Sequence, residues 1–471
     1  MQSLQDLDAD NLDRMVKLAM DTAEAASYEQ AWQIFGRYKI GIVVGRSVCH
    51  SATQQVALLT AVRLAVRVFK GGVSVTGVAG LLPATPLCTS ATLSDEVLAL
   101  GATVVDDVDA ALPCITIGGD TLKTRPGGFC VRITYDGWRC GIVPAEEEWR
   151  LPEKMEFPLS GVAGAALAVN EAFLAARGDT PVCGRRRVGM SLWDLRQEAD
   201  WTDESSNGPC ANYGPSRLWL IGLGHLGQAY LWAIGALDYA SPHEVELVLQ
   251  DYDTITGSTR STSILTDNTQ VGEKKTRAMA TWAERQGFKT AIVERRLNGE
   301  LKRAVDEPGF CLCGIDNALG RTFLEDVGFD YIIEAGLGSG AQDFRSLRLH
   351  TFPGRRKARD IWSRPTQGLK SVANQPAYAD LVLRGLEQCG VTTLAGRAIG
   401  APFVGTMAAC LVVGEALRFI NGGPTFALIN LDLKDIQHRE AVTRGASDGP
   451  LNPGFSLLKH AYKVFKAPTI Q

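Results

Sequence analysis

Short apolar runs alternate with longer segments of helical composition along the second half of the chain. Apolar stretches at 218–221 and 245–251 flank a segment with helical composition through about Ala236. Residues 273–286 and 401–423 have the composition of two further helices, the second closed by glycines. The stretches KTAIVERRL, GFCLCGID and DYIIEAGLG predict three more strands. Strands that alternate with helices are typical of a parallel sheet with helices on both faces.

The first half repeats this order in a less regular form. A strand at 38–45 precedes a helix at 54–72, and residues 128–143 predict a hairpin that turns at Asp136-Gly137. The short stretches VSVTG and ALPCITIGGD predict two more strands. The order of elements therefore indicates an internal duplication.

Two long apolar helices carry the clearest sign of that duplication. The segments that begin at Pro158 and at Pro402 each reach a glutamate, Glu171 and Glu415, after 13 positions. The alternative is that apolar helices resemble one another by composition alone, but the order of the surrounding strands favours duplication. We therefore expect an α/β protein of two Rossmann-like doubly wound domains in a pseudo-two-fold arrangement, the N-terminal one degenerate.

Four segments follow from this repeat. We expect a degenerate domain at 1–195, a polar, turn-rich linker at 196–217, a nucleotide-binding domain at 218–435 and a tail at 436–471. In the first domain Gly45 is followed by the stretch RSVCHSATQQ, whose side chains would keep a phosphate away from the backbone. The first domain is therefore expected to be a scaffold that has lost its nucleotide.

Composition narrows the class of protein. The chain has 471 residues, 45% hydrophobic and 21% charged, and its net charge of −4 gives no general attraction to nucleic acid or membrane. Its 11 cysteines show no C-x-x-C spacing and its six histidines no metal-ligand spacing, so a structural zinc site is not expected. The polar, acidic N-terminus is unlike an export signal, which predicts a cytoplasmic protein with free thiols.

A glycine-rich turn is the first candidate for chemistry. Gly222, Gly224 and Gly227 form a G-x-G-x-x-G motif between a predicted strand and a predicted helix, the arrangement that holds phosphates. Asp251 ends the next strand, where a carboxylate binds ribose hydroxyls. This much fits a nicotinamide enzyme as well as an ATP enzyme.

The residues beyond this carboxylate favour ATP. A second carboxylate, Asp253, is followed by Lys274-Lys275 at the start of a helix, where a lysine can reach back to a triphosphate. Asp316-Asn317 ends a later strand, a suitable place for a carboxylate that holds Mg²⁺ on phosphates. The glycines, a carboxylate for the ribose, a lysine and a carboxylate for the metal together predict a Mg-ATP site. An enzyme that transfers hydride needs no such metal.

The stretches GLGHLG, DYDTITGS, VGEKK and GIDN resemble the adenylating domain of the activating enzymes for ubiquitin-like proteins. The ThiF/MoeB-like enzymes that adenylate bacterial sulfur carriers belong to the same superfamily. The resemblance covers roughly 215–430. It implies that ATP adenylates the C-terminal glycine of a ubiquitin-like protein, that a cysteine then forms a thioester, and that a fused first half is inactive. It assigns phosphates to Gly222, Gly224, Gly227 and Lys275, ribose to Asp251, and Mg²⁺ to Asp316, with Asp253 beside them.

Two arginines are catalytic candidates by the same resemblance. The family has S-N-L-x-R-Q where this chain has STRSTS (258–263), so Arg260 is the candidate for the missing cation. The family also contributes an arginine from a helix of the opposite half, before its first strand. Arg14 is the candidate for it, in preference to Arg37, which lies against that strand. His225 replaces a common glycine of the family.

A cysteine would receive the activated carboxyl group. Cys389 matches the family's cysteine in order and context, in a crossover loop before the helix that Pro402 opens. Cys183 or Cys210 in the polar region, or a cysteine of a partner, are alternatives. Cys311, Cys313 and Cys410 suit the core.

The partners follow from the resemblance too. They are a ubiquitin-like protein with a C-terminal glycine and a conjugating-enzyme-like partner, and some bacterial relatives lie in antiviral defence operons with both. No nucleic-acid or membrane partner is expected, and a homodimer is possible. Two other functions stay open at this stage: an NAD-dependent oxidoreductase, and a non-catalytic scaffold whose ATP site has decayed.

Overall fold

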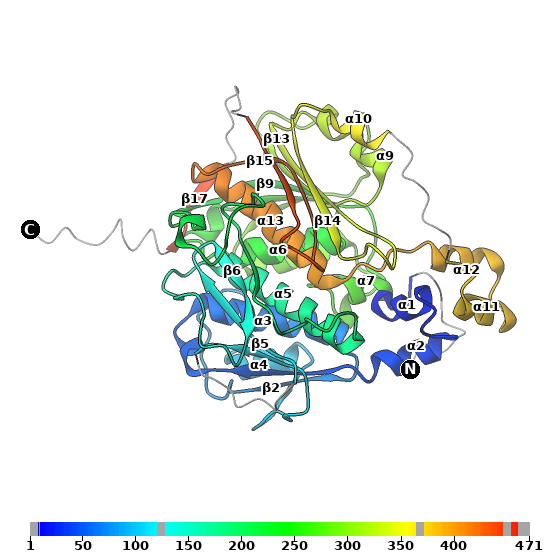
Figure 1. Cartoon of the computed structure of the whole chain (residues 1–471). Helices are drawn as coiled ribbons and strands as arrows, with labels where there is room; N and C mark the ends of the chain where they lie inside the picture. The colour runs from blue at the N-terminus through cyan, green and yellow to red at the C-terminus, as the bar shows by residue number, and fades with distance from the viewer. Residues whose placement is uncertain (1–7, 9, 120–127, 364–371, 446–453, 460–471) are drawn as a thin grey trace, which may run out of the picture.

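The computed structural model describes residues 8, 10–119, 128–363, 372–445 and 454–459. Two sheets dominate it, and their strands run in the same order (Figure 1). The N-terminal sheet has the order β3-β2-β1-β4-β5-β6-β7, with β1 Lys39–Val44, β2 Gly72–Thr76, β3 Thr103–Val104, β4 Cys114–Ile117, β5 Cys130–Asp136, β6 Arg139–Pro144 and β7 Val188–Ser191. Its first five strands are parallel and the last two antiparallel.

The C-terminal sheet repeats this order with one more strand. It runs β11-β10-β9-β12-β13-β14-β15-β16, with β9 Arg217–Ile221, β10 Glu246–Gln250, β11 Lys289–Val293, β12 Phe310–Cys313, β13 Tyr331–Leu337, β14 Ser346–Phe352, β15 Phe426–Asp432 and β16 Glu440–Thr443. Strands β11 to β13 are parallel and β14 to β16 antiparallel. The prediction of two parallel-rich α/β halves is confirmed.

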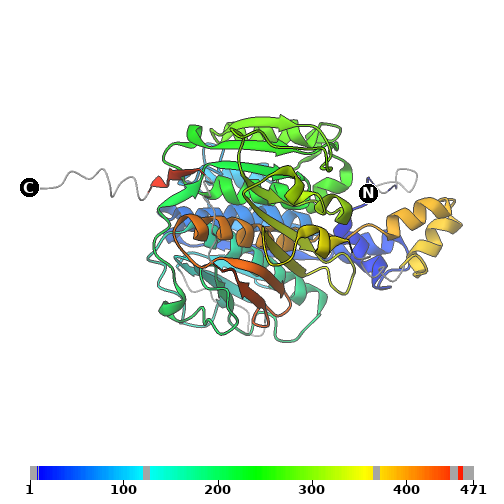
Figure 2. The ribbon, with the colours of Figure 1, turned by 90° about the horizontal axis from the view of Figure 1, so that it is seen from above.

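Four helices fill the space between the two sheets (Figures 1 and 2). They are α3 Ala52–Val68, α5 Pro158–Arg177, α6 His225–Ala236 and α13 Pro402–Ile420. Helices α5 and α13 are long and apolar enough to cross a membrane by length and composition alone, but most of each is buried inside the protein. One hydrophobic core runs through all four helices, so the two halves share their interior.

Corresponding residues of α5 and α13 have corresponding surroundings. Glu171 and Glu415 are fully buried, and each accepts a backbone N–H from the chain beyond its helix, Gly184 at 3.2 Å and Phe426 at 2.9 Å. The repeat seen in the sequence therefore extends to these buried contacts.

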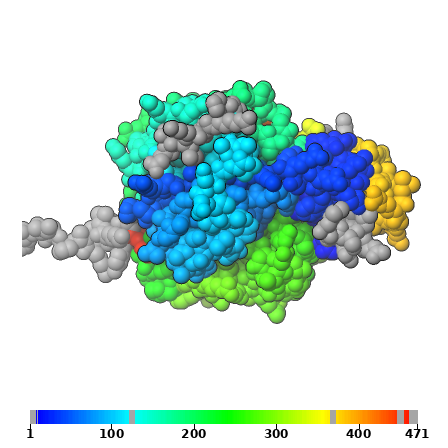
Figure 3. Space-filling view, turned by 90° about the horizontal axis from the view of Figure 1, so that it is seen from below, coloured from blue at the N-terminus to red at the C-terminus, as the bar shows by residue number. Residues whose placement is uncertain are grey.

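Four short helices gather at one end of the molecule (Figures 2 and 3). They are α1 Arg14–Asp21, α2 Tyr28–Phe35, α11 Pro376–Leu383 and α12 Gln388–Ala395. The Tyr378 hydroxyl donates to the buried Asp21 carboxylate at 2.6 Å, and Arg384 pairs with Glu29 at 2.9 Å. The N-terminal helices thus hold a segment that lies more than 350 positions away in sequence.

The remaining elements lie on the outer faces and edges. They are α4 Leu93–Ala99, α7 Gly257–Thr262, α8 Lys275–Arg285, α9 Ala318–Arg321, α10 Ala358–Trp362 and a small sheet of β8 Tyr213–Pro215 with β17 Phe455–Leu457. Helix α8 begins two residues later than predicted because Glu273 accepts a backbone hydrogen bond from Ile255 in the preceding turn. The hairpin of β5 and β6 turns at Gly137, whose φ is +58°, as predicted.

Candidate active site

The three glycines of the motif occupy three different environments at the end of β9. Gly222 has φ +85°, and a Cβ there would lie 2.8 Å from the Ile315 side chain. A Cβ on Gly227 would lie 1.9 Å from the Gly222 carbonyl oxygen. A Cβ on Gly224 would meet no described atom within 4 Å. The first and third glycines are thus needed for the turn and its packing on α6, and the second leaves its backbone open to a ligand.

Asp251 fixes the glycine turn to the end of the neighbouring strand. Its buried carboxylate accepts the Leu223 N–H at 2.7 Å through one oxygen. The other oxygen accepts the N–H groups of Tyr252 at 2.7 Å and Asp253 at 2.8 Å. This carboxylate therefore lies directly beside the glycines, as its place at the end of β10 predicts.

The two lysines at the start of α8 point in different directions. Lys275 forms an ion pair with Asp253 at 2.9 Å, and its side chain is only 13% exposed. Lys274 donates to the Tyr252 carbonyl at 2.7 Å instead. Of the two ammonium groups, that of Lys275 is therefore the one turned toward the carboxylates at the carboxyl edge of the sheet.

Asp316 lies in the turn that follows β12. Its neighbour Asn317 caps α9, since the Asn317 side chain accepts the Gly320 N–H at 3.2 Å. Strand β12 pairs directly with β9, so this turn lies beside the glycine turn at the same edge. Asp316 is exposed and so is open to a ligand.

Arg14 reaches this region from α1 in the N-terminal half. Its guanidinium donates to the Ala398 carbonyl at 2.7 Å, and its backbone N–H donates to the Ser261 hydroxyl at 3.1 Å. Burial, with a smaller effect of Arg397, lowers the pKa of Arg14 to about 10, and the nearby Asp316 carboxylate opposes the shift. Its Nε is buried and has no hydrogen-bond partner among the described residues, so one donor of this guanidinium group is unsatisfied.

Arg260 is oriented toward a different neighbour. The STRSTS stretch forms helix α7, which Thr256 and Thr259 cap reciprocally. The Arg260 guanidinium donates to the Asn268 side chain at 2.6 Å. Among the described residues, the hydrogen bond of this guanidinium therefore lies in the loop after α7 rather than among the carboxylates.

His225 is a feature whose role the sequence did not indicate. Burial lowers the pKa of His225 to about 4, so the ring is neutral at pH 7. Its Nε2 lies where a Cβ on Gly405 would come within 2.2 Å, and it has no hydrogen-bond partner among the described residues. The ring therefore packs the start of α6 against the start of α13. The only signal was a histidine in place of a glycine.

The cysteines divide by exposure. Cys389 is exposed in the first turn of α12, a helix where the sequence suggested a loop. Cys210 is exposed, whereas Cys183 is buried, and burial together with Glu171 raises its pKa to about 12. The buried positions of Cys311, Cys313 and Cys410 are confirmed.

The carboxylates suit a magnesium ion bound mainly by phosphates. The described residues contain no group of three metal-ligating side chains. Mg²⁺ in nucleotide sites is commonly held by one or two carboxylates together with phosphate oxygens, so Asp316 alone satisfies that requirement.

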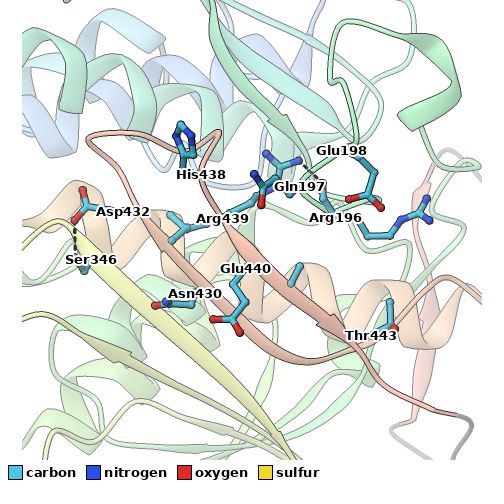
Figure 4. Close-up of a pocket in the computed structure, with 12 residues that line it drawn as sticks. Arg196, Gln197, Glu198, Ser346, Asn430, Asp432, His438, Arg439, Glu440 and Thr443 are labelled. Atoms are coloured by element: carbon cyan, nitrogen blue, oxygen red, sulfur yellow. Dashed lines mark hydrogen bonds between the residues drawn. The ribbon is translucent and has the colours of Figure 1, made fainter.

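A separate cavity lies at the antiparallel end of the C-terminal sheet (Figure 4). Its volume is about 700 Å³, and it shares no lining residue with the glycine turn. Its walls carry both signs of charge, among them Arg196, Glu198, Asp432 and Glu440. This mixed lining shows no preference for an anionic nucleotide.

Comparison with protein families identifies the chain. Residues 39–192 match the model of the BilD N-terminal domain, and residues 214–423 match that of the BilD C-terminal domain. The bacterial E1-like protein BilD of Collimonas sp. (strain OK412) is 41% identical over 436 residues, which are 92% of this chain and 94% of that protein. The class is therefore that of the E1-like proteins. Within it, the chain belongs to the BilD family.

The matches among solved structures are more distant. Escherichia coli MccB is 12% identical, with a TM-score of 0.34 over 67% of this chain and 93% of that one. E. coli tRNA N6-threonylcarbamoyladenosine dehydratase, TcdA, is 13% identical, with a TM-score of 0.28 over 44% of this chain and 86% of that one.

Proposed function

We propose that this protein activates a ubiquitin-like protein by adenylating its C-terminal glycine with ATP. The observation that carries this proposal is that Arg14 of the N-terminal half is bonded to the Ala398 carbonyl of the C-terminal half and lies near enough to Asp316 for the two charges to interact. A cation and a metal-binding carboxylate from two different halves would then face one substrate. Membership of an E1-like family supports the same reaction.

The reaction joins a carboxylate to a phosphate. An oxygen of the glycine carboxylate attacks the α-phosphorus of ATP, the bond to the β-phosphate breaks, and pyrophosphate leaves. Bound Mg²⁺ would neutralise phosphate charge, held through Asp316. Charge builds up on the phosphates as the bond breaks, so nearby fixed cations lower the barrier.

The chain's own residues have distinct tasks in this proposal. The open backbone at Gly224 and the N-terminus of α6 bind phosphate. The Asp251 oxygen that accepts only the Leu223 N–H has a lone pair left for a ribose hydroxyl, while the other oxygen already accepts two backbone N–H groups. Lys275 would exchange its bond to Asp253 for one to phosphate, and the unpaired Nε–H of Arg14 would donate to the reacting carboxylate or phosphate.

We also propose that the N-terminal half binds no nucleotide. Helix α3 is the counterpart of α6, and its first turn is already occupied by a carboxylate of the same chain. Glu156 accepts the Thr53 N–H at 2.8 Å, and the hydroxyls of Ser51 and Tyr135 donate to it at 2.7 Å each. An anionic side chain thus stands where a phosphate would bind, which supports a degenerate first half.

Thioester formation at Cys389 is the second step of the proposal. The thiolate would attack the activated carbonyl, and AMP would leave. Exposure of Cys389 on a segment that projects from the body supports this choice (Figure 2). Cys210 is the exposed alternative, while the burial and raised pKa of Cys183 disfavour it.

The test is exchange of labelled pyrophosphate into ATP. The probe is a ubiquitin-like protein that ends in glycine, used intact and with its final glycine removed. We expect exchange that needs ATP, Mg²⁺ and the intact carrier. The proposal would be contradicted if no pyrophosphate exchange occurred with the intact carrier, or if the carrier without its final glycine supported exchange at the same rate.

A further inference from the structure

A buried arginine of the N-terminal half is hydrogen-bonded to the loop that follows α7. Arg67 of α3 donates through Nε to the Ser263 carbonyl at 2.9 Å. Its Nη2 donates to the carbonyls of Ile264 and Thr266, both at 2.9 Å. Its Nη1 donates to Arg63 of its own helix at 2.7 Å. Three of its bonds therefore cross from one half to the other.

The loop it holds carries no regular secondary structure. Residues 263–266 are all buried, so their carbonyl groups need partners inside the protein. Burial, with contributions from Arg63 and Arg260, lowers the pKa of Arg67 to about 9, which leaves the guanidinium charged at neutral pH. A charged donor makes stronger hydrogen bonds than a neutral one, so Arg67 is a principal restraint on this loop.

Gln228 connects the loop to the glycine turn. Its amide oxygen accepts the Leu265 N–H at 3.1 Å, and its amide nitrogen donates to the Thr266 hydroxyl at 2.8 Å. The same nitrogen lies 3.2 Å from the Leu223 carbonyl, which stands between the first two glycines of the motif. Gln228 is fully buried, so these bonds do not compete with water.

We propose that Arg67 is a positioning residue for the nucleotide: it fixes the 263–266 loop, and through Gln228 that loop fixes the glycine turn. The inference rests on the proposed function only for the identity of the nucleotide. Helix α3 is the counterpart of α6, the helix that carries the phosphate turn in the active half. The inactive half thus uses its own equivalent helix to hold the phosphate turn of its neighbour.

The chain offers variants of graded severity. Arg67→Lys keeps the charge but cannot reproduce three diverging hydrogen bonds to backbone carbonyls. Thr266→Val keeps the shape of the side chain and removes its bonds to Gln228. Arg177→Lys is the control, because the Arg177 side chain is only 8% exposed and pairs with Glu24 and Asp179 rather than with this loop.

Hydrogen exchange of the full ligand-free chain, read by mass spectrometry, is the first readout. We expect Arg67→Lys to speed exchange about tenfold in peptides covering 222–228 and 263–270, the factor of about one lost hydrogen bond. Thr266→Val should also speed hydrogen exchange in both peptides, and Arg177→Lys should change it in neither. Exchange that stays unchanged at 222–228 in both Arg67→Lys and Thr266→Val would overturn the proposal.

Binding of the α,β-methylene analogue of ATP, measured by calorimetry, is the second readout. Its dissociation constant should rise about tenfold in Arg67→Lys and stay within twofold in Arg177→Lys. A wild-type protein that binds no analogue would contradict the proposed function, while the exchange comparison would still decide the role of Arg67. If Arg67→Lys does not fold, Thr266→Val provides both readouts.

Discussion

Substitution of alanine for two glycines of the same motif should affect different properties: stability at Gly227 and nucleotide binding at Gly224. A methyl group on Gly227 would lie 1.9 Å from the Gly222 carbonyl oxygen, so the turn or the helix must move. Overpacking of this kind costs about 1–3 kcal/mol, and the better helix propensity of alanine returns at most about 1 kcal/mol. We therefore expect Gly227→Ala to lower the free energy of unfolding by about 1 kcal/mol.

A methyl group on Gly224 meets no described atom within 4 Å. At this N-cap position the change from glycine to alanine should alter the free energy of unfolding by less than about 1 kcal/mol. If phosphates lie over this backbone, the same methyl group should raise the dissociation constant of the ATP analogue at least about tenfold. Gly224→Ala is then expected to be as stable as the wild type and to bind nucleotide more weakly.

Urea unfolding and calorimetric binding separate the two effects. The reasoning about packing is refuted if Gly227→Ala unfolds at the same urea concentration as the wild type. The assignment of the phosphate site is refuted if Gly224→Ala binds the analogue as tightly as the wild type. The wild-type protein and Arg177→Lys are the references for both measurements.

Other residues give independent expectations. Asp316→Ala should reduce pyrophosphate exchange on the order of 10³-fold with the fold intact by circular dichroism, because it removes the carboxylate proposed to hold Mg²⁺. Lys275→Ala should slow exchange far more than Lys274→Ala, since only Lys275 turns toward a carboxylate of the site; equal losses would indicate a general charge effect. Cys389→Ala should still form the adenylate but show no reducible adduct with the carrier on a non-reducing gel. If the adduct is lost in Cys210→Ala instead, the thioester forms at Cys210. The pKa of His225 falls from 6.5 to about 4 on folding, so stability should be lost as pH falls from 6.5 to 4, by up to about 3 kcal/mol. Urea titrations of the wild type and His225→Ala at several pH values measure this, and equal pH slopes would contradict it.

Local features of the site could be predicted from the sequence because they depend on neighbouring residues. A strand, a tight glycine turn and a helix follow one another directly, and the structure places Asp251 beside them at the end of the next strand. The repeat of Pro158 and Pro402 likewise indicated two sheets of the same order. These features follow from periodicity and backbone requirements that a sequence displays.

Contacts between distant segments could not be predicted in the same way. The resemblance suggested Arg14, but its approach to Asp316 depends on how α1 packs against α7. The role of Arg67 could not be predicted from the sequence, because an arginine in an apolar helix is ordinarily expected on the protein surface. Cys389 lies in a short helix that was not predicted, because its hydrophobic periodicity is weak. Each of these depends on tertiary packing rather than on local pattern.

The central claim is that both halves build one adenylating site, and the mass of the carrier tests it most directly. A ubiquitin-like protein that ends in glycine, incubated with ATP, Mg²⁺ and the Cys389→Ala variant to retain the intermediate, should gain the mass of AMP less water at its C-terminal glycine. The same incubation with Arg14→Ala added to that variant should lose most of this product, and Arg14→Lys should restore part of it. A carrier that never gains this mass, or gains it equally without Arg14, would contradict the account.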